Sequence, residues 1–219
     1  MMETVKEYVN LRHGCVVGRV LRYGRVKKRT IFIVLSFLLI FCFFTGCDKE
    51  AVLKMIYPVK YEEYVEKYAE EYNLDKYMVY AMIKVESGFD PKAESAAGAK
   101  GLMQLMEETA AECSEKEDFG YTIPDDLYVP EYNIRLGCYY LKYLLENYGD
   151  MRLAVIAYNG GTGNLEQWLA DETLTDENGV LNEIPYEETK KYVEKVFTAF
   201  DAYNSIYNGN EENETEELQ

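Results

Sequence analysis

Histidine is almost absent from this chain of 219 residues, which contains only His13. His13 lies near the amino terminus, outside the part of the chain that we expect to fold. The sequence therefore excludes Ser-His-Asp and Cys-His nucleophilic sites, which need an imidazole base. It also excludes the zinc site of the H-E-x-x-H type. Any hydrolytic or lytic chemistry must use carboxylates, hydroxyls and backbone groups.

Basic residues are scarce after the first thirty positions. Residues 1–30 carry eight Lys and Arg against two Glu, whereas the rest of the chain carries fifteen Lys and Arg against thirty-seven Asp and Glu. Such an acidic body argues against a nucleic-acid partner, because phosphates bind basic surfaces. A glycan is compatible with this charge, and the 21 tyrosines suit either a core or a sugar cleft.

No apolar run reaches the roughly 20 residues of a membrane-spanning helix. The longest is 31–44, in which only Ser36 is polar, and it follows the basic run 25–29. This order is typical of a secretory signal. The following Thr-Gly-Cys resembles a bacterial lipobox, except that Phe44 replaces the usual aliphatic residue, and this resemblance implies a lipidated amino terminus at Cys47. The alternative is an uncleaved anchor. Both interpretations place the body outside the cytoplasm, tethered to a membrane.

Strand patterns are nearly absent, and apolar residues recur with helical spacing. The pattern predicts an all-α body at 57–207, preceded by a leader at 1–47 and a tether at 48–56 and followed by an acidic, disordered tail at 208–219. We interpret 171–183 as a solvated insertion rather than a hairpin. The expected helices lie near 61–72, 75–86, 101–113, 133–148, 151–158, 165–170 and 185–203.

Glu86 stands out because it follows the last apolar residue of a helical pattern that Ser87 and Gly88 interrupt. Asp75 is a suitable N-cap for this helix. A carboxylate in the last turn faces the negative end of the helix dipole, and apolar neighbours disfavour its charge. Both effects raise its pKa, so Glu86 is a candidate general acid. The alternative is a solvated glutamate at a helix end.

The body contains two cysteines, Cys113 and Cys138, each within a helical pattern. Outside the cytoplasm a disulfide between them is plausible. Two buried thiols fit the sequence equally well, and the spacing does not decide between them.

Four motifs in order resemble the soluble lytic transglycosylase family. They are Glu86-Ser87-Gly88-Phe89, Gly98-Ala99-Lys100-Gly101-Leu102-Met103-Gln104-Leu105-Met106, Ala157-Tyr158-Asn159-Gly160-Gly161 and 183–193. The resemblance implies a lysozyme-like, all-helical domain of short helices around a glycan cleft. Gly160 and Glu107 depart from the family, which usually has Ala and Pro there.

The resemblance also implies roles for individual residues. Glu86 would be the sole acid and base, and Tyr192 would lie close to it. The residues that it places in or near the glycan cleft are Ser87, Ser95, Met103, Gln104, Tyr158, Asn159, Glu188 and Tyr192. As alternatives, Gln104 caps a helix or faces solvent, and the tyrosines belong to the core.

The implied reaction cleaves the bond between N-acetylmuramic acid and N-acetylglucosamine in peptidoglycan and forms 1,6-anhydro-muramic acid. The substrate supplies its own nucleophile, so the reaction requires no second carboxylate, metal or cofactor. The alternatives are a lysozyme-type hydrolase on the same fold and a non-catalytic peptidoglycan-binding lipoprotein.

Overall fold

A computed structural model describes residues 36–37, 49–117 and 124–208 of the chain, which divides into the units Met1–Cys47 and Asp48–Gln219. In the second unit the described elements are helices, joined by loops with isolated bridges at Glu94–Lys100, Lys100–Leu105 and Thr175–Leu181. The prediction of an all-α body is confirmed. The helices are α2 (Lys49–Ile56), α3 (Glu62–Glu71), α4 (Lys76–Glu86), α5 (Glu107–Glu117), η1 (Pro124–Tyr128), α6 (Pro130–Tyr148), α7 (Met151–Gly160), α8 (Thr162–Leu169), α9 (Glu187–Tyr203) and the π-helical turn η2 (Asn204–Asn208).

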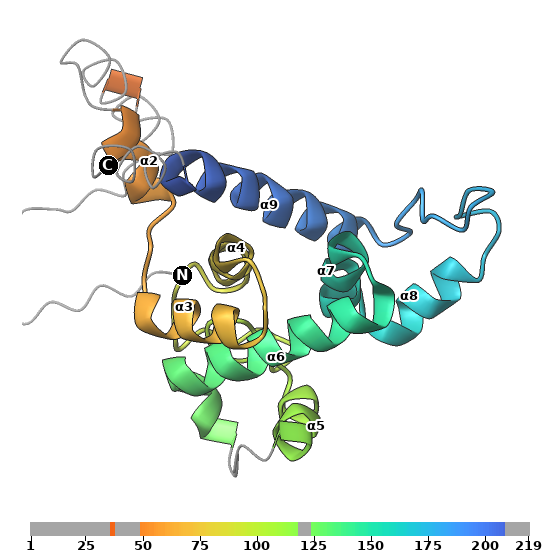
Figure 1. Ribbon diagram of the computed structural model, residues 1–219, viewed down its shortest axis with the longest axis horizontal. Coiled ribbons are helices and arrows are strands. Elements are labelled where there is room, and N and C mark those ends of the chain that lie inside the picture. Colours follow the sequence, from red (N-terminus) through yellow and green to blue (C-terminus); the bar gives the residue numbers. More distant parts are fainter. Residues whose placement is uncertain (1–35, 38–48, 118–123, 209–219) are drawn as a thin grey trace, which may run out of the picture. The chain divides into compact units, whose positions relative to one another are not determined.

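Helix α4 forms the centre of the domain. Figure 1 shows it surrounded by α3, α6, α7 and α9, and α3 and α9 pack directly against it. Every residue from Tyr77 to Ile83 is buried, as expected for a helix that is apolar on all sides. The Asp75 side chain accepts a hydrogen bond from the Tyr77 N–H at 2.7 Å, which confirms the predicted N-cap. This core helix ends at Glu86.

Helix α9 packs against α4 and passes over it in the view of Figure 1. Its inward face buries Tyr192, Val193, Val196 and Tyr203. The prediction that Pro185 opens this helix is wrong, because Tyr186 is the N-cap and the helix begins at Glu187.

The segment 101–106 is not helical, so the prediction of a helix beginning at Gly101 is wrong. Lys100 N–H donates to Leu105 O and Leu105 N–H donates to Lys100 O, which closes a tight loop. Gly101 has φ +76° and Gln104 has φ +48°, both in the left-handed region. A Cβ at Gly101 would lie 2.1 Å from the Leu127 carbonyl oxygen, so a close approach of two backbones requires glycine here. We call residues 100–105 the cleft loop.

The region after α7 also differs from its prediction. The expected loop at 159–164 is wrong, because α7 extends through Gly160, breaks at Gly161 and continues as α8. The segment 171–183 has a single bridge, Thr175–Leu181, and is mostly exposed. It still buries Leu181 in the core.

Two further predictions concern the tether and the cysteines. Part of the expected tether forms α2, and its tethering role stays a prediction. Cys113 and Cys138 are both buried and are not joined by a disulfide, so the structure does not contain the possible bridge. Burial raises the pKa of the Cys138 thiol.

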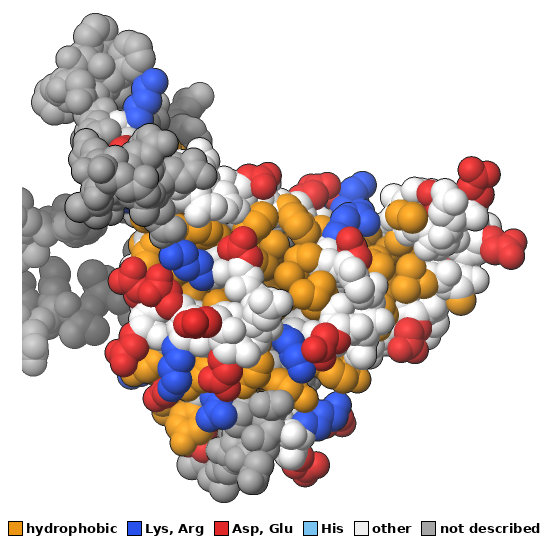
Figure 2. Space-filling model, in the orientation of Figure 1, with side chains coloured by type: hydrophobic (Ala, Val, Ile, Leu, Met, Phe, Trp, Pro, Cys, Tyr) orange, Lys and Arg blue, Asp and Glu red, His pale blue; other side chains and the backbone are white. Residues whose placement is uncertain are grey.

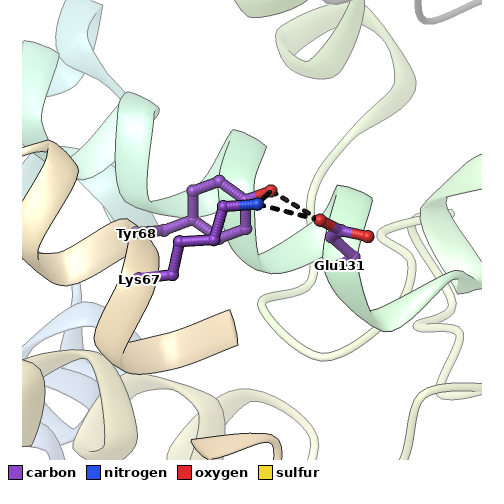
Figure 3. A network of polar contacts seen from close by, with 3 residues as sticks. All are labelled: Lys67, Tyr68 and Glu131. Carbon is purple, nitrogen blue, oxygen red and sulfur yellow. Dashed lines mark hydrogen bonds and ion pairs between the residues drawn. The ribbon is translucent and has the colours of Figure 1, made fainter. Parts of the chain in front are cut away.

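A polar cluster of Lys67, Tyr68 and Glu131 connects α3 to α6 at the surface (Figure 3). The Tyr68 hydroxyl donates to a Glu131 carboxylate oxygen at 2.9 Å, and Lys67 Nζ donates to the same oxygen at 3.2 Å. Both hydrogen bonds lower the pKa of Glu131, and the one from Tyr68 has the larger effect. The cluster holds one side of the ring of helices around α4.

None of the described helices is both long enough and apolar enough to cross a membrane. The leader, including Cys47, lies outside the described residues apart from Ser36 and Phe37, and so does the tail from 209 onward.

Candidate active site

The Glu86 carboxyl is half-buried at the C-terminal end of α4. The Tyr192 hydroxyl, from α9, donates a hydrogen bond to Glu86 Oε1 at 2.6 Å. Burial raises the pKa of Glu86 to about 7, and the Tyr192 hydrogen bond opposes this rise. The prediction that apolar surroundings raise this pKa is confirmed, and no described carboxylate contributes to the shift. A carboxyl with this pKa can donate a proton and take one back near neutral pH.

Burial raises the pKa of the Tyr158 hydroxyl, and the nearby Glu86 carboxylate raises it further. Its hydroxyl donates to the Met103 carbonyl at 2.8 Å. Its ring packs against Tyr140, with the ring centroids 5.2 Å apart. The hydroxyl therefore fixes the cleft loop rather than the Glu86 carboxyl, and the expected place of Tyr158 in the glycan cleft stays a prediction.

Ser87 joins the end of α4 to the cleft loop. Its hydroxyl donates to the Leu102 carbonyl at 2.8 Å, with the Ile83 carbonyl at 3.2 Å as a second acceptor, and it accepts from the Phe89 N–H at 3.1 Å. The Ser87 hydroxyl is thus engaged by backbone groups, and its expected place in or near the glycan cleft stays a prediction. These hydrogen bonds fix the backbone directly after Glu86.

Three residues expected at the cleft belong to the 93–105 region. The Met103 side chain is fully buried against Gly137, so the expectation that it lines an open cleft is wrong for the side chain. Gln104 neither caps a helix nor lies in one, since its amide donates to the Ala93 and Gly101 carbonyls at 3.2 and 2.9 Å. Ser95 is exposed, and its hydroxyl accepts from the Ala99 N–H at 3.0 Å.

Sequence reasoning missed Asn133, which is fully buried in α6. Its Oδ1 accepts from the Met103 N–H at 2.6 Å, and its Nδ2 donates to the Lys100 and Leu127 carbonyls, both at 2.9 Å. The only signal was a polar residue at an apolar helix position. Asn133 therefore anchors the cleft loop, whose Met103 carbonyl holds Tyr158.

Asn159 and Glu188 are exposed and line one groove of about 530 Å³. The groove also contains Tyr186 and Thr189, and it lies where the end of α7 meets the start of α9. The structure therefore brings together two residues that the sequence separates by almost thirty positions. Their contact with a substrate stays a prediction.

The surface around these elements is mixed in charge. Figure 2 shows acidic side chains spread over the visible face, with basic side chains between them. Within the described ranges, no group of three or more His, Cys, Asp or Glu side chains could hold a metal ion.

Removing the Tyr192 hydroxyl should raise the pKa of Glu86 above its value of about 7, because the hydrogen bond that lowers it is lost. The Glu86 carboxyl ¹³C shift, followed by NMR from pH 4 to 10, would measure this in Tyr192→Phe. Tyr140→Phe is the control, because Tyr140 contacts Tyr158 and makes no described hydrogen bond to Glu86. An unchanged or lower pKa in Tyr192→Phe would contradict the assigned role of the hydroxyl.

The site thus combines a half-buried glutamic acid at the end of the central helix with a tyrosine from α9. Residues 63–180 of the chain match the Transglycosylase SLT domain family. The chain belongs to that family. The match ends before α9, which supplies Tyr192.

Among its relatives, the soluble lytic murein transglycosylase of Escherichia coli is 33% identical over 156 residues, covering 70% of this chain and 24% of the relative. The membrane-bound lytic murein transglycosylase C of Edwardsiella ictaluri is 37% identical over 116 residues, covering 48% of this chain and 32% of the relative. This chain thus spans about a quarter to a third of the length of these relatives.

Solved structures show the same fold. The 70 kDa soluble lytic transglycosylase of Escherichia coli superposes with a TM-score of 0.65 at 31% identity, covering 70% of this chain and 25% of that protein. An inactive glutamate-to-glutamine mutant of the lytic transglycosylase Slt of Pseudomonas aeruginosa gives a TM-score of 0.65 at 30% identity, covering 82% of this chain and 30% of that one.

Proposed function

We propose that this chain is a peptidoglycan lytic transglycosylase in which Glu86 is the single acid and base. The observation that carries the proposal is the Glu86 carboxyl, which is half-buried, has a pKa of about 7 and is held by Tyr192. Its relatives named lytic murein transglycosylases support the choice of substrate. The inactive glutamate mutant of the Pseudomonas aeruginosa protein supports a catalytic glutamate.

In the proposed reaction, Glu86 first donates its proton to the glycosidic oxygen between N-acetylmuramic acid and N-acetylglucosamine. The C1–O bond breaks, and the muramyl acetamido oxygen stabilises C1. The Glu86 carboxylate then takes the proton of the muramyl C6 hydroxyl, whose oxygen bonds to C1 and closes the 1,6-anhydro ring. Glu86 ends protonated, as it began, and no water is consumed.

One residue can serve both steps because its pKa lies near the working pH. A glycosidase that uses water or a covalent intermediate needs a second carboxylate beside the bond. In the proposed reaction the C6 hydroxyl of the substrate is the nucleophile, so no second carboxylate is needed. The reaction requires no metal or cofactor.

The groove with Asn159 and Glu188 is the proposed path of the glycan near Glu86. The peptide groups of the cleft loop and the Tyr158 ring form the wall that Asn133 and Ser87 hold in place. In this proposal Gln104 and Ser95 act at the edge of the cleft, and Met103 contributes its carbonyl rather than its side chain.

Product analysis tests the reaction. Purified peptidoglycan is digested with the chain, and the new glycan ends are identified by mass spectrometry. We expect 1,6-anhydro-muramyl ends. Reducing muramic acid ends would instead establish a lysozyme-type hydrolase on this fold, and an intact polymer would favour the non-catalytic binding protein.

We also propose that the chain acts outside the cytoplasm, attached to the membrane through a lipid on Cys47. Replacing Cys47 with alanine should release the protein from the membrane fraction or block its processing, because the thiol that carries the lipid is lost. Fractionation and the mass of the mature protein measure this, with Cys42→Ala, a cysteine inside the apolar run, as the control. Unchanged fractionation and mass in Cys47→Ala would point to the uncleaved anchor.

A further inference from the structure

Helix α2 leaves its apolar side chains in the open. No residue of this eight-residue helix is buried, and Leu53, Met55 and Ile56 are 41%, 82% and 49% exposed. They are three of the nine large hydrophobic side chains that are exposed in the described part of the chain. Single exposed apolar residues are common on protein surfaces, but three on one short helix indicate a contact surface.

These side chains belong to one side of α2, and that side faces away from the domain. At about 100° per residue, Glu50 and Lys54 fall on the opposite side of the helix. There the Lys54 ammonium lies 5.8 Å from the centroid of the Tyr207 ring, in η2. Helix α2 contacts η2 and lies outside the helices that surround α4 (Figure 1). Its polar side therefore faces the domain, the reverse of a helix that packs into a core. The outward, apolar side consists of Ala51, Val52, Leu53, Met55 and Ile56, with Lys49 at its start.

The chain directly after α2 holds the helix on the domain. The Tyr207 hydroxyl donates to the Tyr57 carbonyl at 2.8 Å, and the Tyr203 hydroxyl donates to the Pro58 carbonyl at 2.9 Å. The rings of Tyr57 and Tyr203 meet edge to face, with their centroids 5.5 Å apart. Lys84, from α4, donates to the last carbonyl of α2. These contacts fix the direction of α2 relative to α4 and α9, so a surface that binds α2 also orients the domain.

The position of α2 in the chain indicates which surface this is. The helix begins at Lys49, two residues after Cys47, so a lipid on Cys47 would keep its start within about 7 Å of the attachment point. An uncleaved anchor ending at Phe44 would keep it within about 17 Å. Residues 49–60 also carry three lysines and one glutamate, in contrast to the acidic body. Both forms of attachment therefore bring an apolar helix with basic residues to a membrane surface.

We propose that the apolar side of α2 lies in the surface of the lipid bilayer and holds the domain in one orientation on the membrane. This proposal rests on the proposed membrane attachment. Short amphipathic helices bind in the plane of the interface, where their apolar side chains leave water and enter the acyl boundary. Leu53, Met55 and Ile56 would do so here. Lys49, on the same side, has a long stem that lets its ammonium reach the lipid phosphates.

Tryptophan fluorescence tests this contact, with the full chain reconstituted into vesicles of phosphatidylcholine and phosphatidylglycerol. Met55→Trp adds a tryptophan to the apolar side of α2, and the unaltered chain measures the background from Trp168, its single tryptophan. With lipids brominated on their acyl chains, we expect the added fluorescence to be quenched and its emission to shift to the blue. Val180→Trp is the control, because Val180 is 56% exposed and belongs to 171–183, which Figure 1 shows at the other end of α9 from α2. It should not be quenched.

Removing the apolar side of α2 should remove the contact. In Met55→Trp, the further changes Leu53→Asn/Ile56→Asn should reduce the quenching at least about threefold, because two of the side chains that leave water are lost. Val129→Asn/Val180→Asn removes two exposed apolar side chains from elsewhere in the domain and should leave the quenching unchanged.

The possible failures are distinguishable. An added tryptophan that is not quenched in chains attached to the vesicles would overturn the assignment of α2 and leave the membrane attachment standing. An emission that shifts to the blue without quenching would show that a second copy of the chain covers α2, which also overturns the lipid assignment. Failure of the chain to stay with the vesicles would overturn the proposed attachment, and this inference with it.

Discussion

Replacing Glu86 with glutamine should abolish the cleavage of peptidoglycan by this chain, with a loss of at least about a thousandfold in rate. Glutamine has nearly the same shape but neither donates nor accepts the proton of the proposed reaction. The release of 1,6-anhydro-muramyl ends measures the effect. Glu188→Gln is the matched control, because Glu188 is an exposed carboxyl in the neighbouring groove, and its rate should fall far less. Cleavage by Glu86→Gln at the rate of the unaltered chain would remove Glu86 from the mechanism.

The same substitution should stabilise the fold in a pH-dependent way. The pKa of Glu86 rises from 4.5 in the unfolded chain to about 7 in the folded one. Between these values the folded state binds a proton that the unfolded state has released, so stability falls as pH rises through this range. Glutamine does not titrate, so Glu86→Gln should match the unaltered chain near pH 4 and exceed it by about 3 kcal/mol near pH 8.

Urea unfolding at both pH values measures this difference. If Glu86→Gln loses activity but shows no pH-dependent gain in stability, Glu86 is needed for catalysis but burial does not raise its pKa. The exposed control Glu188→Gln should show no such gain.

Replacing Asn133 with alanine should cost about 3 to 5 kcal/mol of unfolding free energy. The substitution leaves the Met103 N–H and the carbonyls of Lys100 and Leu127 without their buried partner. Urea unfolding measures the loss. Asn204→Ala is a suitable control because, among the described residues, the Asn204 amide bonds only to neighbours one turn away. Its Nδ2 donates to the Phe200 carbonyl at 3.1 Å and its Oδ1 accepts from the exposed Asn208 amide at 2.8 Å, so this change should cost less than about 1 kcal/mol.

Asn133→Ala should also lower activity more than the same loss of stability caused elsewhere. The freed cleft loop carries the Met103 carbonyl that fixes Tyr158 beside Glu86. Rates measured well below the unfolding temperature separate the two effects. A fully active Asn133→Ala under those conditions would show that the cleft loop holds its shape without this anchor.

Local patterns predicted the helices that have an amphipathic or fully apolar sequence and a clear cap. Asp75 and Asp150 both cap the helices that they precede, and the Asp150 carboxylate accepts from the Leu153 N–H at 2.8 Å. The prediction failed at 101–106, where the apolar sequence suits a helix but Asn133 holds the backbone as a loop. It failed again at 159–164, because Gly160 continues α7 rather than ending it.

The sequence alone determined the kind of chemistry available to this protein. A body without histidine leaves carboxylates, hydroxyls and backbone groups, and the helical pattern ending at Glu86 marks this carboxylate as a candidate acid. These conclusions depend on residue types and on neighbours within one or two helical turns, which a linear sequence displays directly.

Only the tertiary structure decided how strongly the pKa of Glu86 is raised, which tyrosine holds its carboxyl, and which side of α2 faces away from the domain. Tyr192 is 106 residues from Glu86 in the chain, and their hydrogen bond forms because α9 packs against α4. Burial and hydrogen bonding are set by helices that meet only when the chain folds. Periodicity predicts each helix and its apolar face, but it does not determine which other helix covers that face.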